Sequence, residues 1–212
     1  IDVGADSWYV IDTGNTENMN VVNGNYTITQ YTKDDYNNKN EDIKIDVYST
    51  YGSNRGYDIT LTKDMVINNN FDVTGGTIDL NGHTLTINGN LLQPGGQIYI
   101  DSGTLEVNGD YRIQSYEKNS VTDEMEYVSS SGYLVMEKSK DIVEIAGDFI
   151  IQSNAVDRRS GTIGYYYVSK NVFKYGTMKV GGDFKQINGT NGTYGDSSNN
   201  YTCSEDHTVI FN

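Results

Sequence analysis

The sequence predicts an all-β fold, a parallel β-helix or β-solenoid with rungs of about 20 residues and loop insertions. Three observations predict it: a self-repeat in mid-chain, apolar pairs that alternate with polar residues, and a glycine-containing turn after each pair. Alternation with a period of two is typical of a half-buried strand. Right-handed connections are the default between parallel strands, so we expect a right-handed solenoid.

The clearest repeat runs from residue 77 to residue 114. Its apolar pairs recur in register: Ile78 and Leu80 return as Ile98 and Ile100, and Leu85 and Ile87 return as Leu105 and Val107. Each unit is too short to bury its own apolar face, so it must stack on its neighbours. We therefore expect the apolar pairs to form the interior and the Asn-Gly turns to form corners.

Weaker copies of the same motif occur outside this stretch. The motif glycines are Gly24, Gly89, Gly109, Gly147 and Gly182, and each copy closes on a glutamine. Only the step from 89 to 109 is a clean rung. The longer steps that follow fit either one rung plus a large insertion or two rungs of which the second is degraded.

This pattern divides the chain into an N-terminal part, residues 1–66, and a solenoid, residues 67–212, which together form a single continuous domain. The N-terminal part holds Trp8 in a strand-like segment, and we expect a capping strand there because an open solenoid end aggregates. The alternating segments 43–51 and 57–67 match the repeat weakly, as degraded rungs or as a small separate cap.

Two polar insertions, residues 115–132 and 153–176, interrupt the solenoid. Each follows the glutamine that closes a motif copy, so stacking at a common phase would put both on the same side. The last strand-like segment, 207–211, resembles half a rung. We therefore expect this chain to be part of a larger multidomain protein.

Composition excludes some partners. The formal net charge is -14 and the pI is about 4.3, so we expect no nucleic acid partner, because phosphate binding requires a basic surface. No apolar run is long enough to insert in a membrane. We expect no cofactor. Ca²⁺ bound by surface carboxylates stays open as an alternative, although no EF-hand or Gly-Asp-rich nonapeptide pattern is present.

The sequence offers no catalytic residue and no metal ligand. His83 and His207 have no spacing typical of a shared metal site, and Cys203 is the only cysteine. One position is repeated through the motif copies as asparagine or aspartate: Asn25, Asn90, Asp110, Asp148 and Asp183. Because a repeated position is explained by the repeat, we interpret these side chains as hydrogen-bond acceptors for backbone amides at a corner.

Tyrosine is the most informative surface feature, with 18 of 212 residues. A tyrosine side chain offers a flat apolar face and a hydroxyl group, which suit sugar rings and protein partners. The insertions concentrate six of them, which we predict to bind the ligand: Tyr116, Tyr127, Tyr165, Tyr166, Tyr167 and Tyr175. The alternative is that these rings pack the insertions onto the solenoid.

The phrases DLNGHTLTINGNLLQPGG, GTLEVNGDYRIQS and GTMKVGGDFKQ resemble repeats in the β-solenoid segments of large secreted or cell-surface proteins of anaerobic Firmicutes. The resemblance covers roughly residues 70–114, 133–152 and 176–186. A looser similarity is to the tāpirins, β-helical cellulose-binding proteins. The resemblance implies an exposed, non-catalytic role at the bacterial cell surface, in adhesion or polysaccharide attachment, and no catalytic residue carries over.

Three hypotheses follow. The leading one is an extracellular, non-catalytic module that attaches to cellulose or another plant cell-wall glycan through exposed tyrosines. The first alternative is a structural spacer or adhesin segment, which needs no aromatic site. The second alternative is a polysaccharide lyase or hydrolase of the β-helix class, which needs carboxylates or basic residues that converge in a groove.

Overall fold

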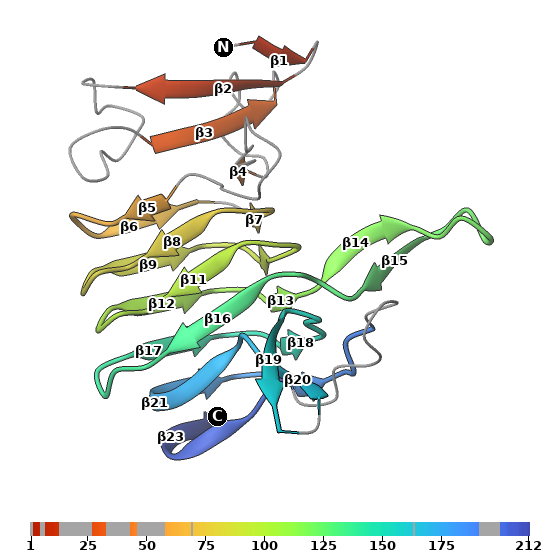
Figure 1. Cartoon of the computed structure of the whole chain (residues 1–212). Helices are drawn as coiled ribbons and strands as arrows, with labels where there is room; N and C mark the ends of the chain where they lie inside the picture. The colour runs from red at the N-terminus through yellow and green to blue at the C-terminus, as the bar shows by residue number, and fades with distance from the viewer. Residues whose placement is uncertain are drawn as a thin grey trace.

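The computed structural model describes residues 2–4, 7–12, 27–32, 43–45, 58–68, 70–162, 164–190 and 200–212. In this part of the chain the fold is all-β, as predicted, with parallel strands stacked in curled sheets (Figure 1). The described strands are β1 (Asp2–Gly4), β2 (Ser7–Asp12), β3 (Thr27–Thr32), β4 (Ile43–Ile45), β5 (Asp58–Thr60), β6 (Met65–Ile67), β7 (Phe71–Val73), β8 (Thr77–Asp79), β9 (Thr84–Ile87), β10 (Leu91–Leu92), β11 (Gln97–Tyr99), β12 (Thr104–Val107), β13 (Tyr111–Ile113), β14 (Ser115–Lys118), β15 (Met125–Val128), β16 (Tyr133–Met136), β17 (Ile142–Ile145), β18 (Phe149–Ile151), β19 (Val156–Gly161), β20 (Gly164–Ser169), β21 (Val172–Val180), β22 (Phe184–Gln186) and β23 (Cys203–Phe211).

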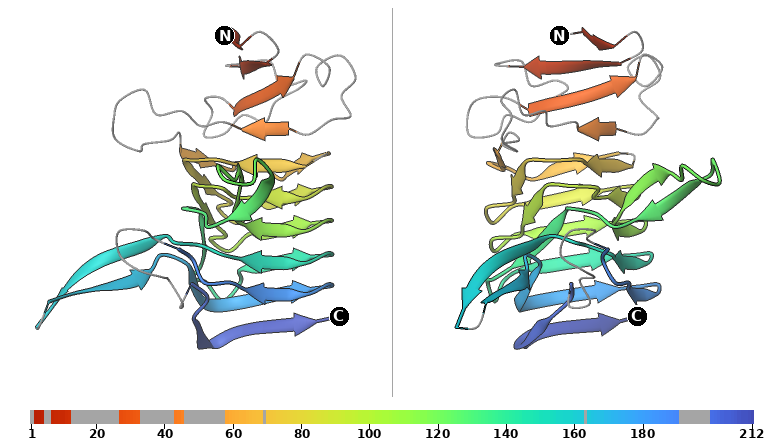
Figure 2. Two further views of the ribbon diagram at one scale, coloured as in Figure 1. Left: turned by 90° about the vertical axis from the view of Figure 1, so that its right-hand side faces the viewer. Right: turned by 45° about the vertical axis from the view of Figure 1, so that its right-hand side comes forward.

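The parallel strands of two large sheets form what we call the parallel stack. The nine-stranded sheet runs in the order β1-β2-β3-β4-β7-β10-β13-β18-β22. The ten-stranded sheet runs in the order β5-β8-β11-β16-β21-β17-β12-β9-β6, and β23 pairs with β21 beyond this path. Each rung contributes one strand to the first sheet and two to the second, so successive rungs lie one below another (Figure 2).

The register confirms the twenty-residue repeat. Leu91 lies beside Tyr111 in the nine-stranded sheet, and Leu85 lies beside Leu105 in the ten-stranded sheet. Further along, Tyr111 pairs directly with Phe149. The next pair in the same column joins Phe149 and Phe184. The longer intervals therefore hold one rung plus an insertion, and not a second, degraded rung.

The alternating apolar pairs fill the interior, as predicted. Leu80, Leu85 and Leu105 are almost completely buried, and each such side chain contributes about 1.5–3 kcal/mol relative to an exposed position. The turns form the corners. At the corner before β9, Asn81 and Gly82 have φ values of 47° and 79°, a left-handed conformation that asparagine and glycine tolerate best.

A buried glutamine supports the corner after β10. The Gln93 amide nitrogen donates to the carbonyl oxygens of Gly96 and Tyr133, and its amide oxygen accepts the hydroxyl of Tyr111 at 2.6 Å. Gln114 and Gln152 are hydrogen-bonded to each other at 2.7 Å, one rung apart. Gln93 therefore satisfies polar groups at the edge of the interior, and Gln114 and Gln152 join two neighbouring rungs.

The parallel pairing begins ahead of residue 67, where the motif becomes clear. Strand β4 pairs with β7, and β5 and β6 pair with β8 and β9, all in parallel. Strands β1, β2 and β3 pair antiparallel, and β2 contains Trp8, the residue of the predicted capping strand. The first motif copy, around Gly24, lies outside the described residues.

Both insertions contain an antiparallel hairpin. The hairpin β14–β15 leaves the parallel stack after β13, and the hairpin β19–β20 leaves it one rung later. Their bases lie side by side, because Ser130 forms a bridge with Ser153. Beyond the bases the two hairpins diverge (Figures 1 and 2). The chain rejoins the stack at Val172, inside the second predicted insertion, where β21 pairs with β16.

Candidate ligand-binding site

Two of the predicted tyrosines meet on the hairpin β14–β15. Tyr116 and Tyr127 are direct cross-strand neighbours, so both side chains project from the same face of the hairpin. Their ring centroids are 4.8 Å apart, and the ring planes are tilted by 43°. The two side chains keep 49% and 45% of their surface exposed. The hairpin thus presents a fixed pair of half-exposed aromatic rings to solvent.

Arg112 connects this tyrosine pair to the parallel stack. It projects from β13, and its guanidinium carbon lies 4.7 Å from the ring centroid of Tyr127, which is a cation–π contact. The same guanidinium donates to the Asp110 carboxylate at 3.0 Å. Arg112 is therefore held by the stack and packs against one ring, which orients the base of the hairpin. We call Tyr116, Tyr127 and Arg112 the tyrosine site.

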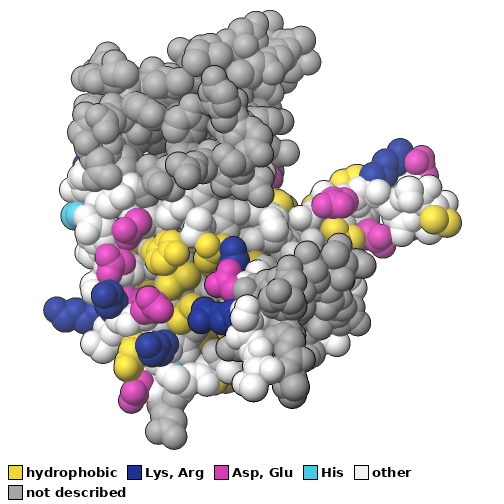
Figure 3. Space-filling view, viewed as in Figure 1, with side chains coloured by type: hydrophobic (Ala, Val, Ile, Leu, Met, Phe, Trp, Pro, Cys, Tyr) yellow, Lys and Arg dark blue, Asp and Glu magenta, His cyan; other side chains and the backbone are white. Residues whose placement is uncertain are grey.

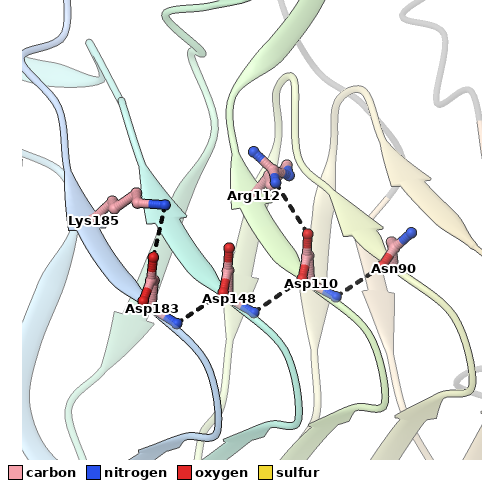
Figure 4. A network of polar contacts seen from close by, with 6 residues as sticks. All are labelled: Asn90, Asp110, Arg112, Asp148, Asp183 and Lys185. Carbon is pink, nitrogen blue, oxygen red and sulfur yellow. Dashed lines mark hydrogen bonds and ion pairs between the residues drawn. The ribbon is translucent and has the colours of Figure 1, made fainter.

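Asp110 belongs to the repeated Asn/Asp column, which forms a hydrogen-bonded ladder (Figure 4). In each rung the side-chain Oδ1 accepts the backbone N–H of the equivalent residue in the next rung. The donor–acceptor distances are 2.7 Å for Asn90 to Asn70, 2.8 Å for Asp110 to Asn90, 3.0 Å for Asp148 to Asp110 and 2.8 Å for Asp183 to Asp148. These hydrogen bonds explain why the Asn/Asp position is repeated: its side chain joins the corners of neighbouring rungs.

The second oxygen of each carboxylate faces outward and differs from rung to rung. Oδ2 of Asp110 accepts Arg112, and Oδ2 of Asp183 lies 2.9 Å from the Lys185 ammonium group. This hydrogen bond with Asp183 raises the pKa of Lys185 above its usual value. Oδ2 of Asp148, between these two pairs, accepts no hydrogen bond from the described part of the chain (Figure 4).

Tyr175 lies away from the tyrosine site. It lines an open, shallow hollow with Ser102 and the turn between β16 and β17, residues 137–140. That turn lies at the opposite edge of the parallel stack from the hairpin β14–β15 in Figure 1. The Tyr175 carbonyl oxygen accepts Nδ1–H of His207 at 3.0 Å. Tyr175 therefore joins neither Tyr116 nor Tyr127.

The remaining three predicted tyrosines lie on β20. The backbones of Tyr165, Tyr166 and Tyr167 pair with Ser160, Arg159 and Arg158 of β19, in that order. The side chains of these tyrosines lie outside the described residues. For these three residues the structure therefore describes the strand pairing of the second hairpin and no side-chain contact.

A second pair of tyrosines was missed by sequence reasoning. Tyr99 and Tyr133 project from the outer face of β11 and β16, where both hydroxyls donate to the Gln97 amide oxygen. Figure 3 shows apolar side chains gathered over this part of the face, among charged groups. Burial, with help from Tyr99 and Asp157, raises the pKa of Tyr133 to about 12, and the Lys170 ammonium lies 5.5 Å from its ring centroid. The sequence feature that could have indicated this pair is an aromatic residue at an outward-facing position of the alternating repeat.

The acidic residues at the corner before β17 do not converge in a groove. Asp141 is buried, and its two oxygens accept the backbone N–H groups of Ser102 and Lys138 at 2.7 and 2.9 Å. Burial raises the pKa of Asp141 above its usual value, and the neighbouring Asp101 adds to the rise. This carboxylate therefore closes a turn.

The described ranges contain neither a metal-binding cluster nor a membrane-spanning helix. No group of three or more His, Cys, Asp and Glu side chains is placed to hold a metal ion. No helix in these ranges has the length and apolar character needed to cross a membrane. Comparison of the chain with protein-family models, with curated proteins and with solved structures found no match.

Proposed function

We propose that the chain is a right-handed β-solenoid module of an extracellular protein and that it binds polysaccharide, without catalysis, through the tyrosine site. The observation that carries this proposal is the exposed pair formed by Tyr116 and Tyr127 on a hairpin that projects from the stack. Aromatic rings that stay half exposed offer apolar faces to sugar rings, and their hydroxyls offer hydrogen bonds. The cell-surface location rests on the sequence resemblance.

The arrangement suits binding better than packing. A tyrosine pair that served only to fix the hairpin would bury its ring faces against the parallel stack. Here Arg112 contacts one ring, and Tyr116 packs against the other tyrosine at the base of the hairpin. About half of each side chain still remains exposed, and this exposed aromatic surface is available to a sugar ring.

A pull-down against insoluble cellulose, xylan, pectin and chitin tests the proposal. The wild type should bind at least one polymer, and Tyr116→Ala and Tyr127→Ala should each weaken binding roughly thirty-fold, the effect of losing about 2 kcal/mol at a central aromatic contact. Val121→Ala is the matched control, because Val121 is 90% exposed in the turn between β14 and β15 of the same hairpin.

The same experiment separates the alternatives. Binding that survives both tyrosine substitutions would contradict the tyrosine site. Absence of binding to every polymer would favour the spacer or adhesin hypothesis. Release of soluble sugar from any polymer would favour the lyase or hydrolase hypothesis.

A further inference from the structure

We propose that the tyrosine site continues along the parallel stack onto the ladder residues, and that its ligand is an uncharged linear polysaccharide whose hydroxyl groups donate to the outer oxygen of Asp148. This inference rests on the proposed function, because it adds subsites beside Tyr116 and Tyr127. It assigns binding roles to Arg112, Asp148 and Lys185.

The first support is the continuity of the surface. The Tyr127 ring contacts Arg112, and Arg112 contacts Asp110, at 4.7 and 3.0 Å. Asp148 is the next member of the ladder after Asp110, and the Asp183–Lys185 pair follows one rung further. In Figure 4 the carboxylates of Asp110, Asp148 and Asp183 point the same way in a row. We call Arg112, Asp148 and Lys185, with their two carboxylate partners, the polar row.

The second support is the spacing of the polar row. Neighbouring strands of a sheet lie about 4.8 Å apart, so the row repeats a polar group at this interval along the stack axis. A ligand that uses such a row must itself repeat along a line. A linear polysaccharide does so, and it leaves the tyrosine rings to stack on one of its sugars.

The third support is the hydrogen-bonding capacity of Asp148. Its inner oxygen already accepts the N–H of Asp183, while its outer oxygen accepts nothing from the described part of the chain. An ionised carboxylate only accepts hydrogen bonds, so this oxygen selects a donor on the ligand. Arg112 and Lys185 carry N–H donors on either side. Sugar hydroxyls satisfy both needs, because each hydroxyl donates and accepts.

Charge then restricts the class of polysaccharide. The polar row has three carboxylates and two cations, and the hairpin from 115 to 128 has four acidic residues and one lysine. The whole chain has a formal net charge of -14. Polymers rich in uronic acids would meet a surface on which negative charges outnumber positive ones. Among the plant cell-wall glycans of the proposed function, this favours the uncharged ones.

Asp148→Asn is the decisive variant, because asparagine already makes the same ladder bond at Asn90. The amide oxygen keeps the bond to the Asp183 N–H, and the outer oxygen becomes an N–H₂ donor. Glu106→Gln is the control. It removes one charge on β12 and keeps an acceptor for the Thr86 hydroxyl. Urea unfolding should give the same free energy of unfolding for both variants.

Calorimetric titrations with cellohexaose, xylohexaose and mannohexaose supply the readout. Asp148→Asn should weaken the binding of whichever sugar the wild type takes by about tenfold, the effect of a lost charge-assisted hydrogen bond. Glu106→Gln should leave it unchanged. Oligogalacturonate serves as the anionic probe, and it should bind more weakly than the uncharged sugar in 0.15 M salt, where the Debye length is about 8 Å.

The outcomes distinguish the inference from the proposed function. If no sugar, charged or uncharged, binds the wild type, both are overturned. If Tyr116→Ala and Tyr127→Ala abolish binding while Asp148→Asn matches Glu106→Gln, the tyrosine site stands and the polar row is overturned. Tighter binding of oligogalacturonate than of every uncharged sugar overturns the uncharged ligand.

Discussion

Replacing Gly147 by alanine should disrupt the ladder that joins the rungs. A Cβ atom at this position would lie closer than 3.0 Å to Oδ1 of Asp110 and 2.9 Å from the backbone carbonyl of Gly109. That same Asp110 oxygen accepts the N–H of Asp148. The carboxyl group must therefore move, and the hydrogen bond between the rungs is lost. A Cβ atom at Gly182 would likewise collide with Oδ1 of Asp148. The ladder therefore depends on the glycine column as well as on the Asn/Asp column.

The expected cost follows from these contacts. Overpacking costs about 1–3 kcal/mol, and a lost hydrogen bond to a charged group costs about 1.5–3 kcal/mol, so Gly147→Ala should lower the free energy of unfolding by about 3–5 kcal/mol. Gly82→Ala is the control. No atom lies within 4 Å of its Cβ position, and only its φ of +79° opposes alanine, at about 1–2 kcal/mol.

Urea unfolding of both variants, with a double-mutant cycle through Asp110→Ala, measures the effect. Because Asp110→Ala removes the carboxyl group that collides with the new methyl group, Gly147→Ala should cost less in that background. If Gly147→Ala costs no more than Gly82→Ala, or if the Gly147 and Asp110 effects simply add, then the two columns are independent and the reasoning fails.

Three further predictions concern the interior. Burial lowers the pKa of His207, although its bond to the Tyr175 carbonyl opposes this, so the folded pKa lies below 6.5. The contribution of the neutral His207 to the free energy of unfolding should therefore be fully present above pH 6.5 and be lost as the pH falls through the folded pKa. Urea unfolding at a series of pH values measures this, and His207→Gln should make the free energy of unfolding less dependent on pH than in the wild type. Tyr111→Phe should cost about 1–3 kcal/mol, because it leaves the buried Gln93 oxygen without its hydroxyl donor. Leu105→Ala should lower the free energy of unfolding by about 3–5 kcal/mol, because it leaves a cavity in the interior. If urea or thermal unfolding shows a smaller loss of stability for Leu105→Ala than for Tyr111→Phe, the described interior packing is contradicted.

Much of the fold was predictable because side-chain period and strand pairing are coupled. The alternation around Leu85 and Leu105 defines which face is buried, and the repeat places equivalent residues side by side. The rung at residues 58–67 was less visible, because the turn between its two strands lacks the Asn-Gly signal. The hairpins could not be predicted, because the insertions are polar and their strands pair only with each other.

The site was predictable only in part. An excess of tyrosine in the insertions indicated Tyr116 and Tyr127, but sequence does not report which rings stay exposed. Tyr175 was grouped with them because it lies in the second predicted insertion, residues 153–176. In the structure β21 runs straight through the corner, where Gly176 has a φ of 82° and Tyr175 is held in the stack. Arg112 was missed because an outward arginine within a repeat has no distinctive spacing, and its role depends on the hairpin that folds beside it.

The most direct test of the central claim is an NMR titration of the whole chain, with ring-labelled tyrosines, against cellohexaose, xylohexaose and mannohexaose. With at least one of these sugars, the ring signals of Tyr116 and Tyr127 should shift in a saturable way, while the signal of the buried Tyr111 stays in place. A titration in which no sugar moves the Tyr116 and Tyr127 signals, or in which only Tyr99 and Tyr133 respond, would contradict binding at the tyrosine site.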